Sequence, residues 1–184
     1  IYNISLYAPI HNFNRKFLLE QQKESIQRTY GGGEKEKIDN FDWKIIERYA
    51  VNVRQSSLEI AKSLNTTPDT IRRRIKNLEK KKVIVGYKLG LNLEKLGCVS
   101  YRVDIQLFST KRNKEIYDYC KYHNNIYQIN KTIGGADLGV EAIVRNINEL
   151  IQLVNEFKQK FNDVINDIDY FSFSTFHILK YIPD

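Results

Sequence analysis

One short stretch, TTPDTIRRRIKNLEKKKVIVGY from Thr66 to Tyr87, carries the side chains best suited to binding a charged partner. On a helix, with roughly 100° per residue, Ile71, Ile75 and Leu78 share one face and the charged residues fall nearly opposite or on the flanks. Such a helix buries one side and presents a cationic side to a polyanion such as DNA. The candidate DNA-binding residues are Thr67, Asp69, Thr70, Arg72, Arg73, Arg74, Lys76 and Lys80.

The predicted roles of these residues differ along the helix. Arg74 lies nearer the apolar stripe, so its side chain would have to reach outward or meet a phosphate at the edge of a groove. Since most charged helix faces are simply solvated, the neighbouring elements must decide between solvent and DNA. Early exposed positions are candidates for base reading and the others for phosphate contacts: Asp69, Thr70 and Arg73 for bases, and Arg72, Lys76 and Lys80 for phosphates.

The stretch before the cationic helix predicts two more helices. Asp39 can cap the first, and Ser56 with Glu59 forms a capping box at the start of the second. Thr67 caps the cationic helix, and Pro68 occupies its first position, where the missing N–H costs nothing. Two short helices joined by a tight turn predict a helix-turn-helix whose second helix enters the major groove. The expected apolar stripes are Ile45, Ile46, Tyr49 and Ala50, then Leu58, Ala61 and Leu64.

Charge is distributed unevenly along the 184 residues, whose net charge is +7. Residues 39–97 hold thirteen lysines and arginines against seven acidic residues, whereas residues 98–184 hold ten against eleven. One basic module joined to a neutral one is typical of a polyanion-binding domain attached to a different body. With 42% hydrophobic residues, the chain is apolar enough to fold into one or two small domains.

Residues 38–97 resemble the N-terminal half of the Lrp/AsnC regulators, also called feast/famine proteins. The resemblance implies a winged helix-turn-helix over 38–85 that binds double-stranded DNA, and a linker strand over 86–97 that leads to an effector domain. The matching residues stand in the family's order and spacing: Ile38, Asp39, Asp42, Ile45, Ile46, Asn52, Arg54, Ser56, the helix from Thr67 to Leu78, Glu79, Val83, Ile84, Gly86, Tyr87 and Asn92.

Residues 98–184 contain strand and helix patterns, beginning with residues 98–108, which alternate apolar and polar positions as a half-buried strand would. The predicted order β-α-β-β-α-β is that of a ferredoxin-like sandwich, so the fold class is α+β. Such a sheet leaves one face uncovered, and we therefore expect a homodimer or a higher even-numbered oligomer through the sheets. Strands are expected over 98–108, 126–132, 138–144 and 168–181, and helices over 111–123 and after a cap at Asn146.

The turn TIGGADLG resembles the Gly-x-x-Asp signature of the family's effector-sensing RAM domain, with Gly134 and Asp137 in the matching positions. The resemblance implies that Gly134, Gly135, Ala136 and Asp137 hold a small effector such as an amino acid. A second interpretation needs no ligand, because the two glycines suit a positive-φ turn between strands. The chain departs from the family at FNDVINDID, which lacks the usual Pro-Gly.

Residues 1–37 lie outside the resemblance and end in a Gly-rich linker. A strand is possible over 1–10, and apolar spacing predicts an amphipathic helix over 12–27. The segment is expected to be a fragment of a preceding domain or an extension that packs on a partner subunit. Because the sequence contains no methionine, Ile1 is not a translational start, and we expect the sequence to be part of a longer chain.

Other functional classes are less favoured. No apolar run approaches a membrane span and no secretory signal is visible, so we expect a cytoplasmic protein without a membrane partner. Cys98 and Cys120 are expected to be free thiols, and no metal or cofactor is predicted. An enzyme is not expected, although sirohaem decarboxylases share the two-domain architecture and would use His123 or His177 with Arg145. A further alternative is an amino-acid sensor that does not bind DNA.

Overall fold

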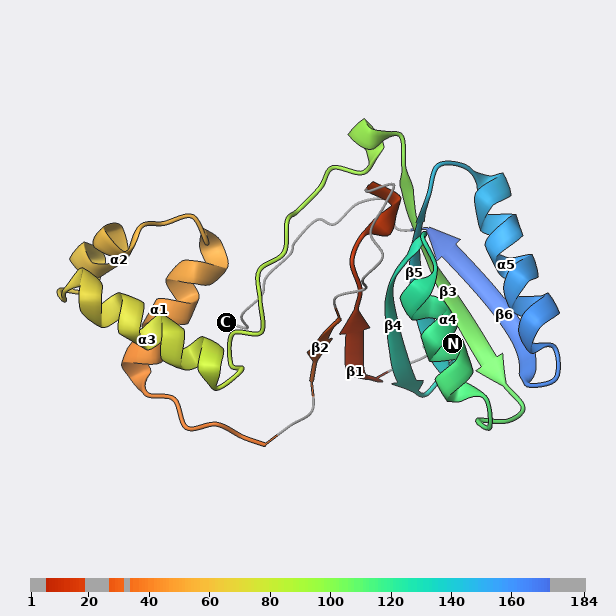
Figure 1. Cartoon of the computed structure of the whole chain (residues 1–184), viewed down its shortest axis with the longest axis horizontal. Helices are drawn as coiled ribbons and strands as arrows, with labels where there is room; N and C mark the ends of the chain where they lie inside the picture. Colours follow the sequence, from red (N-terminus) through yellow and green to blue (C-terminus); the bar gives the residue numbers. More distant parts are fainter. Residues whose placement is uncertain (1–5, 19–26, 32–33, 173–184) are drawn as a thin grey trace. The chain divides into compact units, whose positions relative to one another are not determined.

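The computed structural model describes residues 6–18, 27–31 and 34–172, which form two compact units (Figure 1). The helical unit comprises residues 34–89, and the sheet unit comprises the described residues before 32 together with 90–172. The N-terminal strands therefore belong to the same unit as the C-terminal half of the chain. The helical unit lies between these two parts of the sheet unit in the sequence.

Three helices build the helical unit: α1 (Asn40–Val51), α2 (Ser57–Ser63) and α3 (Pro68–Lys80). Each begins at the predicted cap, because the side chains of Asp39, Ser56 and Thr67 accept a hydrogen bond from the backbone N–H three residues later. Reciprocal capping boxes form at α1 and at α2. The core of the unit contains Ile45, Ile60, Ala61, Ile71 and Ile75.

One predicted core position of α2 is wrong. Leu58 is 52% exposed, and Ile60 is fully buried beside Ala61. With α2 starting at Ser57, the positions that face α1 and α3 are those of Ile60 and Ala61, while Leu58 in the first turn points outward. The short helix offers too few residues for its apolar period to fix the buried face.

The sheet unit contains the predicted β-α-β-β-α-β order. Its elements are β3 (Val99–Leu107), α4 (Asn113–Tyr122), β4 (Ile126–Ile133), β5 (Leu138–Val144), α5 (Ile147–Phe161) and β6 (Ile165–Ser172). All pairs are antiparallel, in the order β4-β5-β3-β6, and Asn146 caps α5 as predicted. Both helices pack on one face of this sheet through a single apolar core that includes Ile116, Phe157 and Phe161. The predicted strand after Ser172 lies outside the described residues.

The N-terminal segment extends this sheet. β1 (Leu6–Asn12) pairs with the edge of β4, and β2 (Arg28–Tyr30) pairs with β1, so the described sheet has six strands in the order β2-β1-β4-β5-β3-β6. The helix predicted over 12–27 is not found in the described part of that stretch, where Asn12 ends β1 and Lys16–Leu18 form a 3-10 turn. Phe13 is buried in the core of the sheet unit, so this apolar position packs against the sheet. Residues 19–26 of the predicted helix lie outside the described residues.

The linker strand predicted over 86–97 is not formed either. Residues 86–92 have no regular secondary structure, and Glu94–Leu96 form a 3-10 turn. A strand needs a neighbouring strand to satisfy its backbone groups, and no described segment pairs with this one. Cys98 and Cys120 are buried free thiols, as predicted.

A polar cluster lies on the sheet face opposite the helices. Arg102 of β3 is 5% exposed, and its Nε donates to the Asp104 carboxylate at 2.6 Å. The guanidinium lies over Gly139 of β5, where a Cβ atom would stand 2.2 Å from Nη2 and 2.8 Å from the amide nitrogen of Asn130. Gly139 therefore leaves the space in which this buried cation lies.

Candidate nucleic-acid interface

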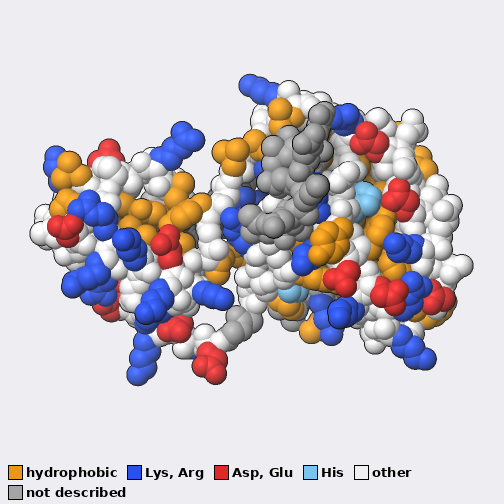
Figure 2. Space-filling view, in the orientation of Figure 1, with side chains coloured by type: hydrophobic (Ala, Val, Ile, Leu, Met, Phe, Trp, Pro, Cys, Tyr) orange, Lys and Arg blue, Asp and Glu red, His pale blue; other side chains and the backbone are white. Residues whose placement is uncertain are grey.

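The cationic face of α3 is formed as the helical period predicts. Ile71, Ile75 and Leu78 are buried, whereas Arg73, Lys76 and Lys80 are exposed and have no ion-pair or hydrogen-bond partner among the described residues. Figure 2 shows Lys and Arg side chains gathered on the visible surface of the helical unit. Unpaired cations on a helix surface can approach phosphates or base edges without first breaking contacts within the protein.

The N-terminal turn of α3 carries the other predicted base-reading residues. Thr67 and Asp69 are exposed, and Thr70 is half-buried with its hydroxyl 3.0 Å from that of Thr67. Arg72 forms an ion pair with Asp69, with 57% and 88% of the two side chains exposed. Exposed pairs of this kind contribute about 0–1 kcal/mol, so Arg72 can leave Asp69 for a phosphate at little cost.

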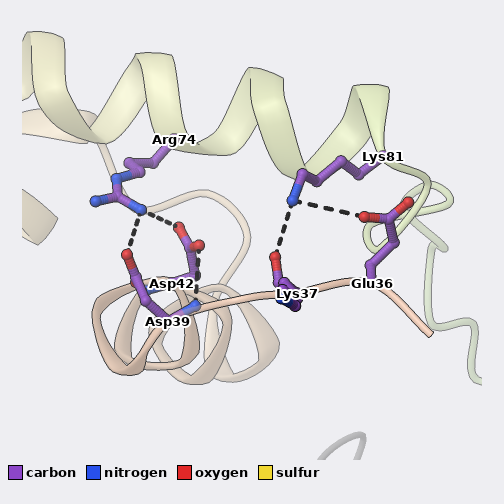
Figure 3. A network of polar contacts seen from close by, with 6 residues as sticks. All are labelled: Glu36, Lys37, Asp39, Asp42, Arg74 and Lys81. Atoms are coloured by element: carbon purple, nitrogen blue, oxygen red, sulfur yellow. Dashed lines mark hydrogen bonds and ion pairs between the residues drawn. The ribbon is translucent and has the colours of Figure 1, made fainter.

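Arg74 behaves differently from its neighbours, because its side chain points toward α1. Its Nη1 lies 2.6 Å from the carboxylate of Asp39 and 3.2 Å from that of Asp42, and the guanidinium packs over the Phe41 ring (Figure 3). Hydrogen bonding to the N-cap carboxylate raises the pKa of Arg74. The Asp42 N–H and Arg74 together lower the pKa of Asp39. The structure thus separates Arg74 from the exposed face with which it was grouped.

Two further contacts of α3 had no signal in the sequence. At the C-terminal end of the helix, the ammonium of Lys81 donates to the carbonyl of Lys37 at 2.8 Å and lies 3.5 Å from the Glu36 carboxylate. The hydroxyl of Tyr87 donates to Glu79 at 2.8 Å, and its ring contacts Tyr49. The chain therefore touches α3 both where it enters the helical unit and where it leaves it.

The turn predicted to bind an effector joins β4 to β5. Gly134 and Gly135 have φ values of 81° and 95°, as the ligand-independent interpretation requires. The Asp137 carboxylate accepts a hydrogen bond from the Leu107 N–H at 2.7 Å, and the Thr132 hydroxyl donates to the Ala136 carbonyl. Asp137 thus ties the turn to the end of β3. A carboxylate can accept about four hydrogen bonds, so this contact leaves capacity for a ligand ammonium.

The residues proposed for enzymatic chemistry do not converge. The Nδ1 of His123 accepts a hydrogen bond from the Asn125 N–H, so the neutral ring carries its proton on Nε2. This Nε2 lies 3.3 Å from the Glu156 carboxylate. Burial lowers the pKa of His123 in spite of this carboxylate. Arg145 is exposed at the start of α5, and His177 lies outside the described residues. In the described chain no group of three metal-ligating side chains is present.

Comparison with known proteins agrees with this geometry. The family model described as winged helix-turn-helix DNA-binding matches residues 38–85. An uncharacterized HTH-type transcriptional regulator of Pyrococcus furiosus is 30% identical over 127 residues, which span 67% of this chain and 79% of that protein. The regulator LrpA of Pyrococcus horikoshii is 40% identical over 60 residues, which span 33% and 43% of the two chains. The chain belongs to the Lrp/AsnC family of helix-turn-helix transcriptional regulators.

Solved structures show the same fold beyond the DNA-binding domain. AsnC of E. coli has a TM-score of 0.69 at 22% identity and covers 80% of this chain and 100% of its own. A transcriptional regulator of Neisseria meningitidis in complex with L-Met has a TM-score of 0.71 at 15% identity, and the match covers 80% of this chain and 97% of that one. This Lrp/AsnC protein is thus a transcriptional regulator that binds DNA through its winged helix-turn-helix, and the relatives found are regulators rather than enzymes. Among the described residues, no helix has the length and hydrophobicity of a membrane span.

Proposed function

We propose that this regulator reads a specific DNA sequence with the exposed face of α3. The observation that carries the proposal is the set of unpaired cations, Arg73, Lys76 and Lys80, on a helix whose opposite face is buried. Arg73 lies nearest the N-terminal end, which enters the major groove first, so it is assigned to a base. Lys76 and Lys80, farther along the helix, are assigned to phosphates.

The test starts from DNA fragments selected out of a random pool by the purified protein. Arg73→Ala is expected to weaken binding to the selected sequence by roughly 1–3 kcal/mol and to relax preference at one base pair. Lys76→Ala should weaken binding to selected and random DNA alike and reduce the slope of log K against log salt by about one unit. Equal losses on both kinds of DNA for Arg73→Ala would refute the assignment of Arg73 to a base.

We further propose that a small zwitterion such as an amino acid binds at Gly134–Asp137. Backbone N–H groups in a positive-φ turn can hold a carboxylate, and the remaining acceptor capacity of Asp137 can hold an ammonium. The L-Met complex of the Neisseria relative supports this choice of ligand class. Calorimetric titration of the twenty amino acids is the test. Absence of binding below millimolar concentration for every one of them would refute an amino-acid effector.

The regulator is also proposed to act as a two-fold dimer or a higher even-numbered oligomer. A single helix-turn-helix makes few contacts, whereas two related by symmetry can bind half-sites about one helical turn apart or a multiple of it. The sheet face opposite α4 and α5 is the proposed contact surface. Light scattering at micromolar concentration should give twice the chain mass or an even multiple, and a monomer would refute the assembly.

A further inference from the structure

Two cations, Arg74 of α3 and its C-cap residue Lys81, bind groups of the protein outside this helix. Arg74, in the middle of the helix, and Lys81, at its end, both point to the segment Glu36–Asp42, which leads into α1 and forms its first turn (Figure 3). Glu36 and Lys37 precede the residues that match the family model. These contacts therefore connect the recognition helix to the segment by which the chain arrives from β2.

The burial of Asp42 indicates that its contact with Arg74 would be costly to break. Only 7% of the Asp42 side chain is exposed, and a buried carboxylate requires a nearby cation or several hydrogen bonds. Asp39 and Asp42 also exchange hydrogen bonds with each other's backbone N–H in the capping box. To reach a phosphate, Arg74 would have to leave two carboxylates and the face of Phe41, and the Asp42 charge would remain uncompensated.

We propose that Arg74 and Lys81 are positioning residues, which fix α3 against the segment Glu36–Asp42 and make no contact with DNA. The inference rests on the proposed reading of DNA by α3. Tyr87 holds the other end of the helical unit to the same helix through Glu79. The segments at both ends of the helical unit thus contact α3 or its C-cap.

A phosphate contact and a positioning contact leave different signatures. Each neutralised phosphate releases counterions and adds about 0.9 to the slope of log K against log salt, for any DNA sequence. A positioning residue instead keeps the base-reading side chains aligned, so its loss lowers the preference for the operator over random DNA. The number of phosphates contacted, and with it the salt slope, stays the same.

The experiment measures binding of the full chain to the selected operator and to a random duplex by fluorescence anisotropy at four salt concentrations. Arg74→Ala is expected to lower the preference for the operator over random DNA by about fivefold or more, with an unchanged salt slope. Lys81→Ala is expected to lower the preference to a smaller extent, also with an unchanged slope. The matched control is Lys76→Ala, which should lower the slope by about one and leave the preference unchanged. An Arg74→Ala result that matches this control would overturn the inference.

Asp39→Asn answers the same question if Arg74→Ala fails to fold. Asparagine caps a helix as well as aspartate does, so this variant removes one of the two charge partners of Arg74, the one at 2.6 Å, while keeping the cap. A positioning role predicts a lower operator preference with an unchanged slope. If Arg74 were a phosphate contact, its release from Asp39 would instead strengthen binding to both duplexes and leave the operator preference unchanged. Wild-type protein that binds neither duplex would refute the proposed function itself, whereas normal wild-type binding with either contrary result refutes this inference alone.

Discussion

Replacing Gly139 by alanine tests whether the buried Arg102 guanidinium depends on the space above β5. The new Cβ would stand 2.2 Å from Nη2 and 2.7 Å from Cζ of Arg102, and 2.8 Å from the Asn130 amide nitrogen. Carbon and nitrogen atoms in contact normally lie more than 3 Å apart, so both side chains have to move. Arg102 is 5% exposed and has little room to do so without losing Asp104.

The expected magnitude follows from overpacking in a filled interior. Inserting one methyl group at such a site costs about 1–3 kcal/mol. At roughly 4 °C per kcal/mol for a domain of about 100 residues, the melting temperature of the sheet unit should fall by about 4–12 °C. The backbone adds no strain of its own, because the φ of Gly139 is outside the left-handed region.

Far-UV circular dichroism during heating is the assay, and Gly90→Ala is the matched control. A Cβ at Gly90 meets nothing within 4 Å, so this change should be neutral or slightly stabilising. The single tryptophan, Trp43 in α1, reports the helical unit separately, and its fluorescence transition should stay in place. In an Arg102→Ala background the effect of Gly139→Ala should shrink by half or more. Gly139→Ala behaving like Gly90→Ala would refute the role assigned to the space above β5.

Three further changes address the effector turn, a buried histidine and the exit from the helical unit. Asp137→Ala should lower the free energy of unfolding by about 1–2 kcal/mol, because it leaves the Leu107 N–H without its acceptor. Asp137→Asn should keep that hydrogen bond and lose only affinity for a ligand ammonium. Denaturation measures the first effect and calorimetric titration the second. Because burial lowers the pKa of His123, protonation favours the unfolded chain, and stability should fall as the pH drops below about 6.5. Melts between pH 7 and 5 should show this loss reduced in His123→Gln. Tyr87→Phe should destabilise the helical unit by about 0.5–1 kcal/mol, measured by tryptophan fluorescence, through loss of the bond to Glu79.

Features that depend on neighbours in the sequence could be predicted from it. Each cap of the helical unit involves residues three apart, so Asp39, Ser56 and Thr67 indicate where helices begin whatever the rest of the chain does. The apolar residues of β3 and β5 likewise indicate strands from local sequence, although residues on both faces of β5 are buried. The βαββαβ order therefore followed from local patterns and was confirmed.

Pairings between distant segments could not be predicted in this way. β1 pairs with β4 across more than 100 residues of sequence, with Leu6 opposite Ile133, and the sequence of neither strand indicates its partner. The short apolar run after β1 fits a helix as well as a segment that buries Phe13, and the tertiary context selects the latter. For the effector turn, the glycines indicated its conformation, but the bond from Leu107 to Asp137 depends on the end of a third strand.

The partners of the charged side chains of α3 could likewise not be predicted from local sequence. The helical period correctly placed Arg74 near the apolar stripe, but it could not tell a phosphate from the carboxylates of Asp39 and Asp42 as the partner. Within α3, all of which the structure describes, four exposed cations remain on the surface. At about 0.9 per phosphate, the three that are assigned to phosphates, Arg72, Lys76 and Lys80, can supply a salt slope of roughly 2.7 per chain and about 5.4 for a two-fold pair. A steeper slope would require cations outside the recognition helix. The basic charge of this sequence is therefore an upper bound on its contacts with DNA, because part of it holds the reading helix in place.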